Sequence, residues 1–316
     1  MELESDRFQN LKYAEDAFKT EAGAVYGEYR KNRTSPFFTI YEALRAAAFK
    51  THTYGHTTMG YEADIAAMPS MYAYSKEFFA RYYRPENVTL LVTGDVKPET
   101  VFDLAQRHYG DWKRGYQTPT IPEEPPQTEE RRIDVSYQGR SLPIVWAAYK
   151  LPRFDANDRK WAATEALGEL AFGETSALYK KLVLDDQVLQ SLSGGPSINR
   201  DPSLFDVIAQ VKDPAKIDAV LADVDATIAG FAAAPCDPAK LAATQQRLKY
   251  GFLMGLSSPS SVASGLARII AVTGDVQTVD RLYATYAALT PADVQAAARD
   301  FLKPERRTVG VLKGTQ

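Results

Sequence analysis

The spacing of apolar positions predicts helices along most of the first part of the chain. Leu3, Phe8 and Leu11 fall roughly on one helical face, so an amphipathic helix is already under way at the first residues, with no cap before it. We therefore interpret Met1 as the interruption of a longer chain. Further helices are expected at about residues 15–32, 36–49, 70–83 and 97–109.

The second part of the chain mixes strands with helices. Short apolar or β-branched runs predict strands at about residues 142–149, 188–192 and 204–211. Helices are expected at about 158–171 and 176–184, and further helices separated by Pro, Gly and Ser follow from 214 to about 300. This mixture predicts an α+β fold.

A polar, proline-rich stretch separates the two parts. Residues 115–132 contain four prolines, four glutamates and few apolar side chains, a composition that cannot form a packed core. We place a linker at 119–130, which leaves a first domain at 1–118 and a second at 131–316.

The two parts end in a similar way. A helix runs into Arg84-Pro85-Glu86-Asn87 and then the apolar run Val88–Val92, which is expected to be a strand. A helix at 291–302 runs into Lys303-Pro304-Glu305-Arg306 and then a strand at Thr308–Leu312. We interpret this likeness as a domain duplication.

The duplication predicts that the first domain is incomplete. The first copy has about ninety residues fewer before its proline than the second copy has. The expected architecture is therefore two related α/β-sandwich domains, each an antiparallel sheet with helices packed on one face, the first of them lacking its N-terminal part.

Composition narrows the classes of function. With 45% hydrophobic and 24% charged residues the chain is globular, and a net charge of −3 with scattered Lys and Arg argues against nucleic acid as a partner. Cys236 is the only cysteine, so an internal disulfide or a cysteine-rich zinc site is excluded. No apolar run approaches the ~18 residues of a membrane span.

Two glutamates in the helix expected at 15–32 are candidate functional residues. Glu21 and Glu28 are seven residues apart, nearly two helical turns, so both side chains lie on one face, roughly 10 Å apart along the axis. Small neighbours would let another element approach that face. The spacing alone equally fits a solvated acidic surface.

These glutamates open a longer series of motifs that resembles the middle of the first domain of the pitrilysin/insulinase peptidases. The similarity continues through almost the whole chain. The series, in chain order, is Glu21-x-x-x-Val25-x-x-Glu28, Ser35-Pro36, Phe49-x-x-His52-x-Tyr54-Gly55, Met59-Gly60, Asp64-Ile65, Phe78-Phe79, Tyr82-Tyr83, Arg84-Pro85-Glu86-Asn87 and Val92-Thr93-Gly94-Asp95.

The resemblance implies a zinc site that is only partly present here. These inverzincins hold zinc through the two histidines of an H-x-x-E-H helix and a glutamate downstream. By the resemblance, Glu28 is that metal ligand and Glu21 is the acidic residue beside the site, our candidate catalytic residue. We expect Glu28 to point into a cavity in which histidines from elsewhere complete the zinc site.

The remaining features depart from the family. The sequence contains no H-x-x-E-H, and its histidines are His52, His56 and His108. His52 and His56 have a metal-binding spacing, but their Thr- and Gly-rich surroundings favour a loop. After the family-like segment 176–182, Val183 and Gln190 stand where many members have a substrate-binding arginine and tyrosine.

The resemblance implies a zinc-dependent metalloendopeptidase for short or unfolded peptides, inactive as this chain alone. The alternative is a non-catalytic partner or scaffold subunit of such a peptidase. The implied partners are peptide substrates, held as an added strand at a sheet edge, and a second pitrilysin-like half or a second copy of the chain. Export to the periplasm is expected from the resemblance, and the substrate-binding residues are left unassigned.

Overall fold

One five-stranded sheet forms the centre of the second part of the chain. The structure, a computed structural model, describes residues 1–315. The strands lie in the order β1-β5-β2-β4-β3, with β1 and β5 parallel and the other neighbours antiparallel. The strands are β1 (Arg131–Gln138), β2 (Ile144–Leu151), β3 (Leu189–Pro196), β4 (Ser203–Val211) and β5 (Arg307–Thr315).

Helices of the second part cover one face of this sheet. Their apolar side chains join those of alternate strand positions, such as Val145, Ala147 and Tyr149 of β2, in the larger of two cores. The helices are α7 (Arg159–Phe172), α8 (Ala177–Tyr179), α9 (Ile217–Ala233), α10 (Pro238–Gly255), α11 (Pro259–Thr273), α12 (Thr278–Ala287) and α13 (Pro291–Phe301).

A helix from the first part of the chain covers the opposite face. On α3 (Pro36–Ala48), Ile40 and Leu44 are fully buried against Ile144 and Trp146, which alternate with the β2 residues of the other face. Because both faces of β2 are buried, this strand is an almost continuous apolar run. The two parts of the chain therefore share a core.

Within the residues that the structure describes, the regular elements of the first part of the chain are all helices. The expected strand at Val88–Val92 is wrong, because this segment is neither helix nor strand and Leu90 is 48% exposed. A strand needs a neighbour to pair its backbone groups, and all the described strands lie beyond residue 130. The helices are α1 (Glu2–Asn10), α2 (Glu15–Asn32), α3, α4 (Glu62–Ala67), α5 (Tyr72–Tyr82) and α6 (Pro98–Tyr109).

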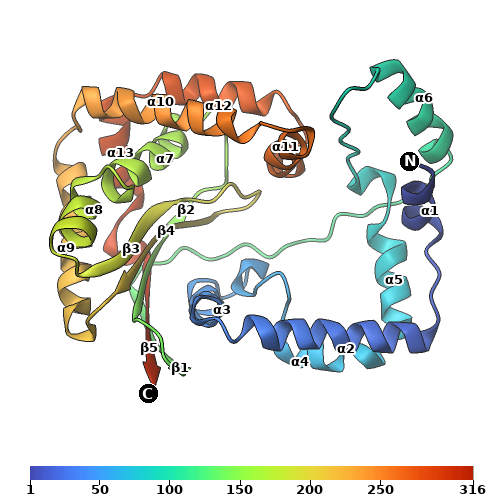
Figure 1. Cartoon of the computed structure of the whole chain (residues 1–316), viewed down its shortest axis with the longest axis horizontal. Coiled ribbons are helices and arrows are strands. Elements are labelled where there is room, and N and C mark those ends of the chain that lie inside the picture. The colour runs from blue at the N-terminus through green and yellow to red at the C-terminus, as the bar shows by residue number, and fades with distance from the viewer. Residues whose placement is uncertain (316) are drawn as a thin grey trace.

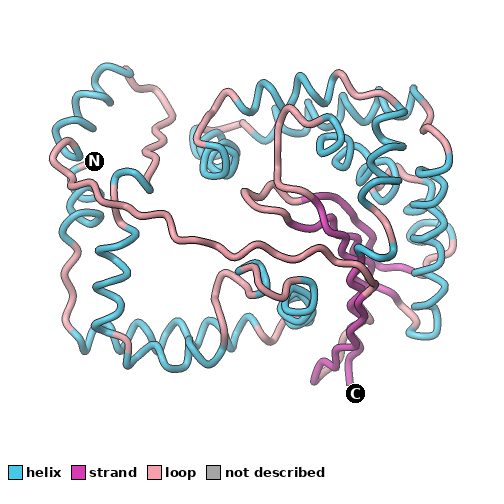
Figure 2. Tube along the Cα trace, turned by 180° about the vertical axis from the view of Figure 1, so that it is seen from behind, coloured by secondary structure: helices cyan, strands magenta, loops and turns pink. Residues whose placement is uncertain are grey.

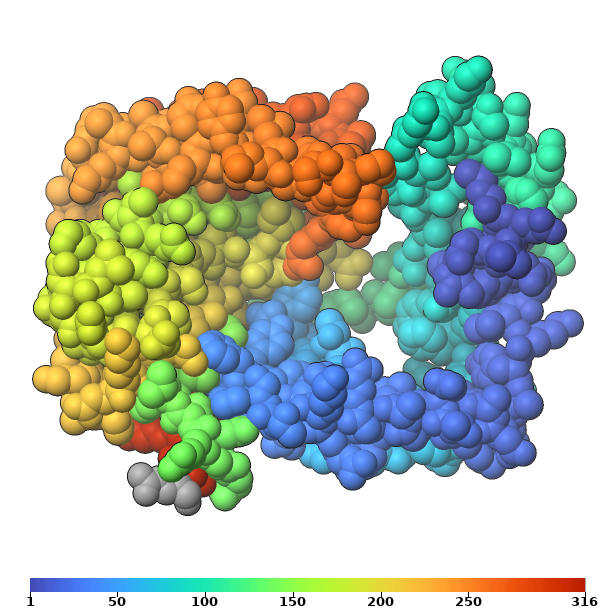
Figure 3. All heavy atoms as spheres, in the orientation of Figure 1, coloured from blue at the N-terminus to red at the C-terminus, as the bar shows by residue number. Residues whose placement is uncertain are grey.

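The elements of the chain form a ring around an opening. From α3, which lies against the sheet, α2 leads away to α1, α5 and α6, and an extended segment returns from α6 to the sheet (Figures 1 and 2). The Thr93 hydroxyl donates a hydrogen bond of 2.7 Å to the Pro259 carbonyl at the start of α11, which closes the ring on the other side. Figure 3 shows an opening between these parts.

The buried Arg307 fixes the place where the extended segment enters the sheet. Its guanidinium pairs with Glu130, just before β1, and with Asp225 on α9. It also donates a 3.4 Å hydrogen bond to the Tyr149 hydroxyl. Burial raises the pKa of Tyr149 to about 12, although the charge of Arg307 opposes this effect.

The α+β class is confirmed, and most predicted elements lie where the apolar spacing places them. The strand β1 is the main element that the sequence analysis does not predict, and its parallel pairing with β5 makes the sheet mixed rather than antiparallel. No helix within residues 1–315 has the length and apolar character needed to span a bilayer. The domain duplication remains a prediction.

Candidate functional site

The helix α2 carries both candidate glutamates and is anchored by an adjoining side of the helix. Its first turn holds Glu15 and Asp16 and its last turn Arg30 and Lys31, charges that complement the helix dipole. Its buried residues are Ala22 and Tyr29, and the helix packs against α4 and α5. The Tyr29 hydroxyl donates a 2.9 Å hydrogen bond to Glu42 on α3. These contacts fix α2 relative to the sheet.

Glu21 and Glu28 directly precede the buried residues Ala22 and Tyr29 in sequence but are themselves exposed. Within residues 1–315 Glu28 is exposed and no described strand lies in the part of the chain that surrounds α2, so its place in a metal-binding cavity stays a prediction. Neither carboxylate forms an ion pair with the basic groups of residues 1–315. The structure therefore leaves this face of α2 open.

The residues that the structure describes contain no metal site. No group of three or more His, Cys, Asp or Glu side chains within residues 1–315 is arranged to hold a metal ion. Structural and catalytic zinc sites in proteins use at least three protein ligands. One exposed carboxylate such as Glu28 does not fit zinc by itself, so the chain alone does not provide a zinc centre.

His52 and His56 form contacts within the loop that follows α3. His52 precedes the short 3-10 turn Thr53–Gly55, where its Nδ1 accepts a 3.0 Å hydrogen bond from the Tyr54 amide. The buried His52 ring places its Nε2 3.6 Å from a carboxylate oxygen of Asp201, in the turn between β3 and β4. His56 instead has its Nδ1 2.8 Å from the Thr57 carbonyl oxygen. The expected loop is confirmed.

The two positions that depart from the family lie in different surroundings. Val183 is partly buried against the larger core, within the π-helical segment Lys180–Asp185. Gln190 is exposed where the register between β3 and β4 shifts. Neither side chain has the guanidinium or phenol chemistry of the residues that it replaces.

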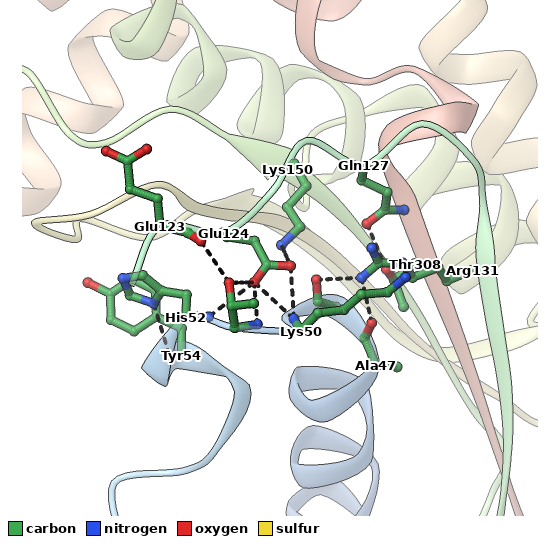
Figure 4. A network of polar contacts seen from close by, with 12 residues as sticks. Ala47, Lys50, His52, Tyr54, Glu123, Glu124, Gln127, Arg131, Lys150 and Thr308 are labelled. Carbon is green, nitrogen blue, oxygen red and sulfur yellow. Dashed lines mark hydrogen bonds and ion pairs between the residues drawn. The ribbon is translucent and has the colours of Figure 1, made fainter. Parts of the chain in front are cut away.

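A buried polar junction that the sequence analysis does not predict lies between the two parts of the chain (Figure 4). The Glu124 carboxylate accepts hydrogen bonds from the amides of Lys50, Thr51 and His52 at 2.8–3.1 Å. The Lys150 amine of β2 lies 3.7 Å from the same carboxylate and 3.6 Å from the centre of the Phe49 ring. The segment after α3, the linker and the sheet meet here.

The junction changes the acidity of both charged groups. Burial alone would raise the pKa of Glu124, but the three amides and the charge of Lys150 together lower it to about 2. Burial lowers the pKa of Lys150 to about 8, although the charge of Glu124 opposes this effect. Both groups are thus charged at neutral pH, and the carboxylate remains charged well below it.

Arg131 holds the end of α3 beside this junction. Its guanidinium donates hydrogen bonds of 2.8 and 2.9 Å to the carbonyls of Ala47 and Ala48. These carbonyl groups lie in the last turn of the helix and have no N–H donor within it. The cation of Arg131 also complements the negative end of the helix dipole. The only sequence signal for the junction is a lysine next to the end of an otherwise apolar strand.

Comparisons with known proteins identify the family. Residues 72–248, more than half of the chain, match the family described as "Peptidase M16 inactive domain". The chain belongs to the peptidase M16 family. This membership confirms the resemblance to the pitrilysin/insulinase peptidases, and it rests mainly on a domain of the type named inactive.

Curated M16 relatives match almost the whole chain. The chain is 29% identical over 320 residues to a protein named zinc protease PqqE of Helicobacter pylori, and the match covers 99% of this chain and 70% of that protein. An uncharacterized zinc protease of Streptomyces coelicolor is 21% identical, with 96% of this chain and 66% of that protein covered. The chain thus spans about two thirds of the length of these relatives.

Solved structures share the fold. A protease from Helicobacter pylori superimposes with a TM-score of 0.91 at 28% identity, covering 99% of this chain and 75% of that one. A peptidase M16 inactive domain from Pseudomonas fluorescens superimposes with a TM-score of 0.83 at 15% identity, covering 99% and 73%. The arrangement of a five-stranded sheet and surrounding helices is therefore that of M16-like peptidases.

Proposed function

We propose that this chain is part of an M16 zinc metalloendopeptidase, to which it contributes Glu28 as a metal ligand and Glu21 beside the metal. The observation that carries the proposal is the pair of exposed glutamates on one face of α2, within a chain whose relatives are named zinc proteases. The other ligands, an H-x-x-E-H pair of histidines, are supplied by polypeptide other than residues 1–316.

Exposed apolar side chains around α1, α5 and α6 support the same proposal. Leu90 and Val92 in the unpaired segment are 48% and 38% exposed, Phe102 on α6 is 71% exposed and Leu3 on α1 is 84% exposed. Large exposed apolar side chains of this kind are candidates for an interface with further polypeptide.

A non-catalytic partner or scaffold subunit is the second candidate. It is favoured by the match to a domain described as inactive, by the absence of a three-residue metal cluster within residues 1–315, and by Val183 and Gln190. In that case the chain would shape the chamber of a peptidase whose metal lies entirely in another chain. Two carboxylates kept two turns apart on an open helix face are the feature that this candidate leaves unexplained.

Peptide hydrolysis by a reconstituted protein separates the two candidates. The chain would be co-expressed with an H-x-x-E-H-containing segment taken from a pitrilysin/insulinase peptidase and assayed on a quenched fluorescent unfolded peptide. The peptidase proposal predicts turnover that Glu28→Gln abolishes. A matched control, Glu99→Gln on the exposed start of α6, should retain it. Equal turnover in both variants would support the scaffold role instead.

Partners and location follow from the same proposal. The substrates are short or unfolded peptides, because an added strand at a sheet edge requires an extended backbone. The partner is a second pitrilysin-like half or a second copy of the chain. We also propose the periplasm as the compartment, on the basis of the family resemblance alone.

A further inference from the structure

Glu124 closes a long excursion of the chain. It binds the amides of residues 50–52, which lie 72–74 positions earlier in the sequence. Between these points the chain forms α4, α5 and α6 and the extended return segment. We call residues 53–123 the outer lobe. The excursion therefore begins and ends at a single point, where residues 50–52, the linker and β2 meet (Figure 4).

The contact at this point has the geometry of a clamp. Three successive backbone N–H groups converge on one carboxylate, and the Thr51 hydroxyl donates a 2.7 Å hydrogen bond to the carbonyl of the neighbouring Glu123. The Glu124 side chain is only 7% exposed. Charge-assisted hydrogen bonds of this kind are roughly twice as strong as neutral ones. The amine of Lys150, on β2, lies 3.7 Å from the carboxylate, so the clamp also contacts the sheet.

The stretch before Glu124 has one other contact of this kind, the 2.9 Å hydrogen bond from the Gly115 amide to the Glu86 carboxylate, and both of its residues lie within the outer lobe. Residues 113–123 form neither helix nor strand. The next anchor is Gln127, whose buried amide donates a 2.7 Å hydrogen bond to the Arg307 carbonyl. Without the clamp, the free linker would extend by three residues, which reach about 10 Å when extended. The outer lobe would then be held by its packing against α1, α2 and α3 and by the Thr93–Pro259 hydrogen bond.

We propose that Glu124 is a positioning residue that fixes the outer lobe relative to the second part of the chain and thereby sets the width of the opening seen in Figure 3. This inference rests on the proposed function, because the opening matters as a route for peptides only if the protein acts on them. The position of the outer lobe itself depends on neither zinc nor peptide.

A distance measurement on the full chain tests the clamp. Nitroxide labels would be placed at Asp103→Cys on α6 and Lys249→Cys on α10, two exposed positions without ion pairs within residues 1–315, in a Cys236→Ser background. Pulsed electron paramagnetic resonance would then give the distribution of label distances. Glu124→Gln should broaden the distribution by several Å, up to the ~10 Å that the freed linker allows.

Glu123→Gln is the matched control, because it removes the same charge one residue earlier while its carbonyl still receives the Thr51 hydroxyl. It should leave the distribution as narrow as in the wild-type chain. Glu124→Asp keeps the charge on a shorter side chain and should give an intermediate width, which serves as the test if Glu124→Gln does not fold. Distributions as narrow as the control in both Glu124 variants would overturn the inference, whether or not Glu28 binds zinc.

Discussion

Replacing Glu165 should remove a pH dependence from the stability of the second part of the chain. Glu165 lies on α7, and its charge acts on Tyr283 and Tyr286 of α12. No cation within residues 1–315 forms an ion pair with it. Burial raises its pKa from 4.5 to about 7, and the negative charge of Glu169, 3.9 Å from Arg247 of α10, adds to the increase.

The raised pKa of Glu165 determines whether stability rises or falls with pH. The folded protein holds the proton on Glu165 up to about pH 7, whereas the unfolded chain releases it near pH 4.5. The stability that this group contributes is therefore complete below pH 4.5 and is lost as the pH rises to about 7. At about 1.4 kcal/mol per pKa unit, the difference between the folded and unfolded pKa of Glu165 corresponds to about 3 kcal/mol of unfolding free energy.

Glu165→Gln supplies a neutral side chain of the same shape at every pH. Urea unfolding followed by tryptophan fluorescence, repeated between pH 4 and pH 8.5, should show equal stability of variant and wild type at the acidic end. At pH 8 the variant should be more stable by about 3 kcal/mol. Glu174→Gln, at an exposed position just after α7, should keep the wild-type pH dependence. Parallel curves for wild type and Glu165→Gln would refute the reasoning.

Three further predictions concern packing and surface. Arg307→Ala should lower the free energy of unfolding by about 1–3 kcal/mol in urea titrations, because it removes a buried guanidinium that pairs with two partly exposed carboxylates, and no measurable effect would contradict this. Gly168→Ala should cost about 1–3 kcal/mol, because the added methyl would lie 2.5 Å from a backbone carbonyl oxygen of β3, whereas Gly230→Ala on α9 has open space and should stabilise the helix. The purified chain should bind the dye ANS through the exposed apolar residues of its first part, and absent dye fluorescence would disprove that exposure.

The sequence predicts the elements well where each segment determines its own structure. Helices such as α2 and α6 have regular apolar spacing, and β4 is a compact apolar run. The strand β1 has the alternation of Ile133, Val135 and Tyr137 that marks a half-buried strand, but it begins within a stretch whose composition indicates a linker. The polar, proline-rich residues before β1 therefore hide its alternation of apolar and polar positions.

Features that depend on distant partners could not be read from the sequence. Val88–Val92 has a strand-like composition, yet pairing decides whether such a segment becomes a strand, and the described residues offer no partner. Glu124 and the amides that it binds are 72–74 residues apart, and nothing local distinguishes it from Glu123. The spacing of Glu21 and Glu28 places them on one face, but it does not determine what covers that face.

Metal content tests the central claim most directly. The chain would be purified together with an H-x-x-E-H-containing segment taken from a pitrilysin/insulinase peptidase, and zinc would be counted by mass spectrometry against protein concentration. The account predicts about one zinc per complex, lost in Glu28→Gln and retained in the control Glu99→Gln. One zinc per complex in Glu28→Gln as well would show that Glu28 is not a ligand and would contradict the account.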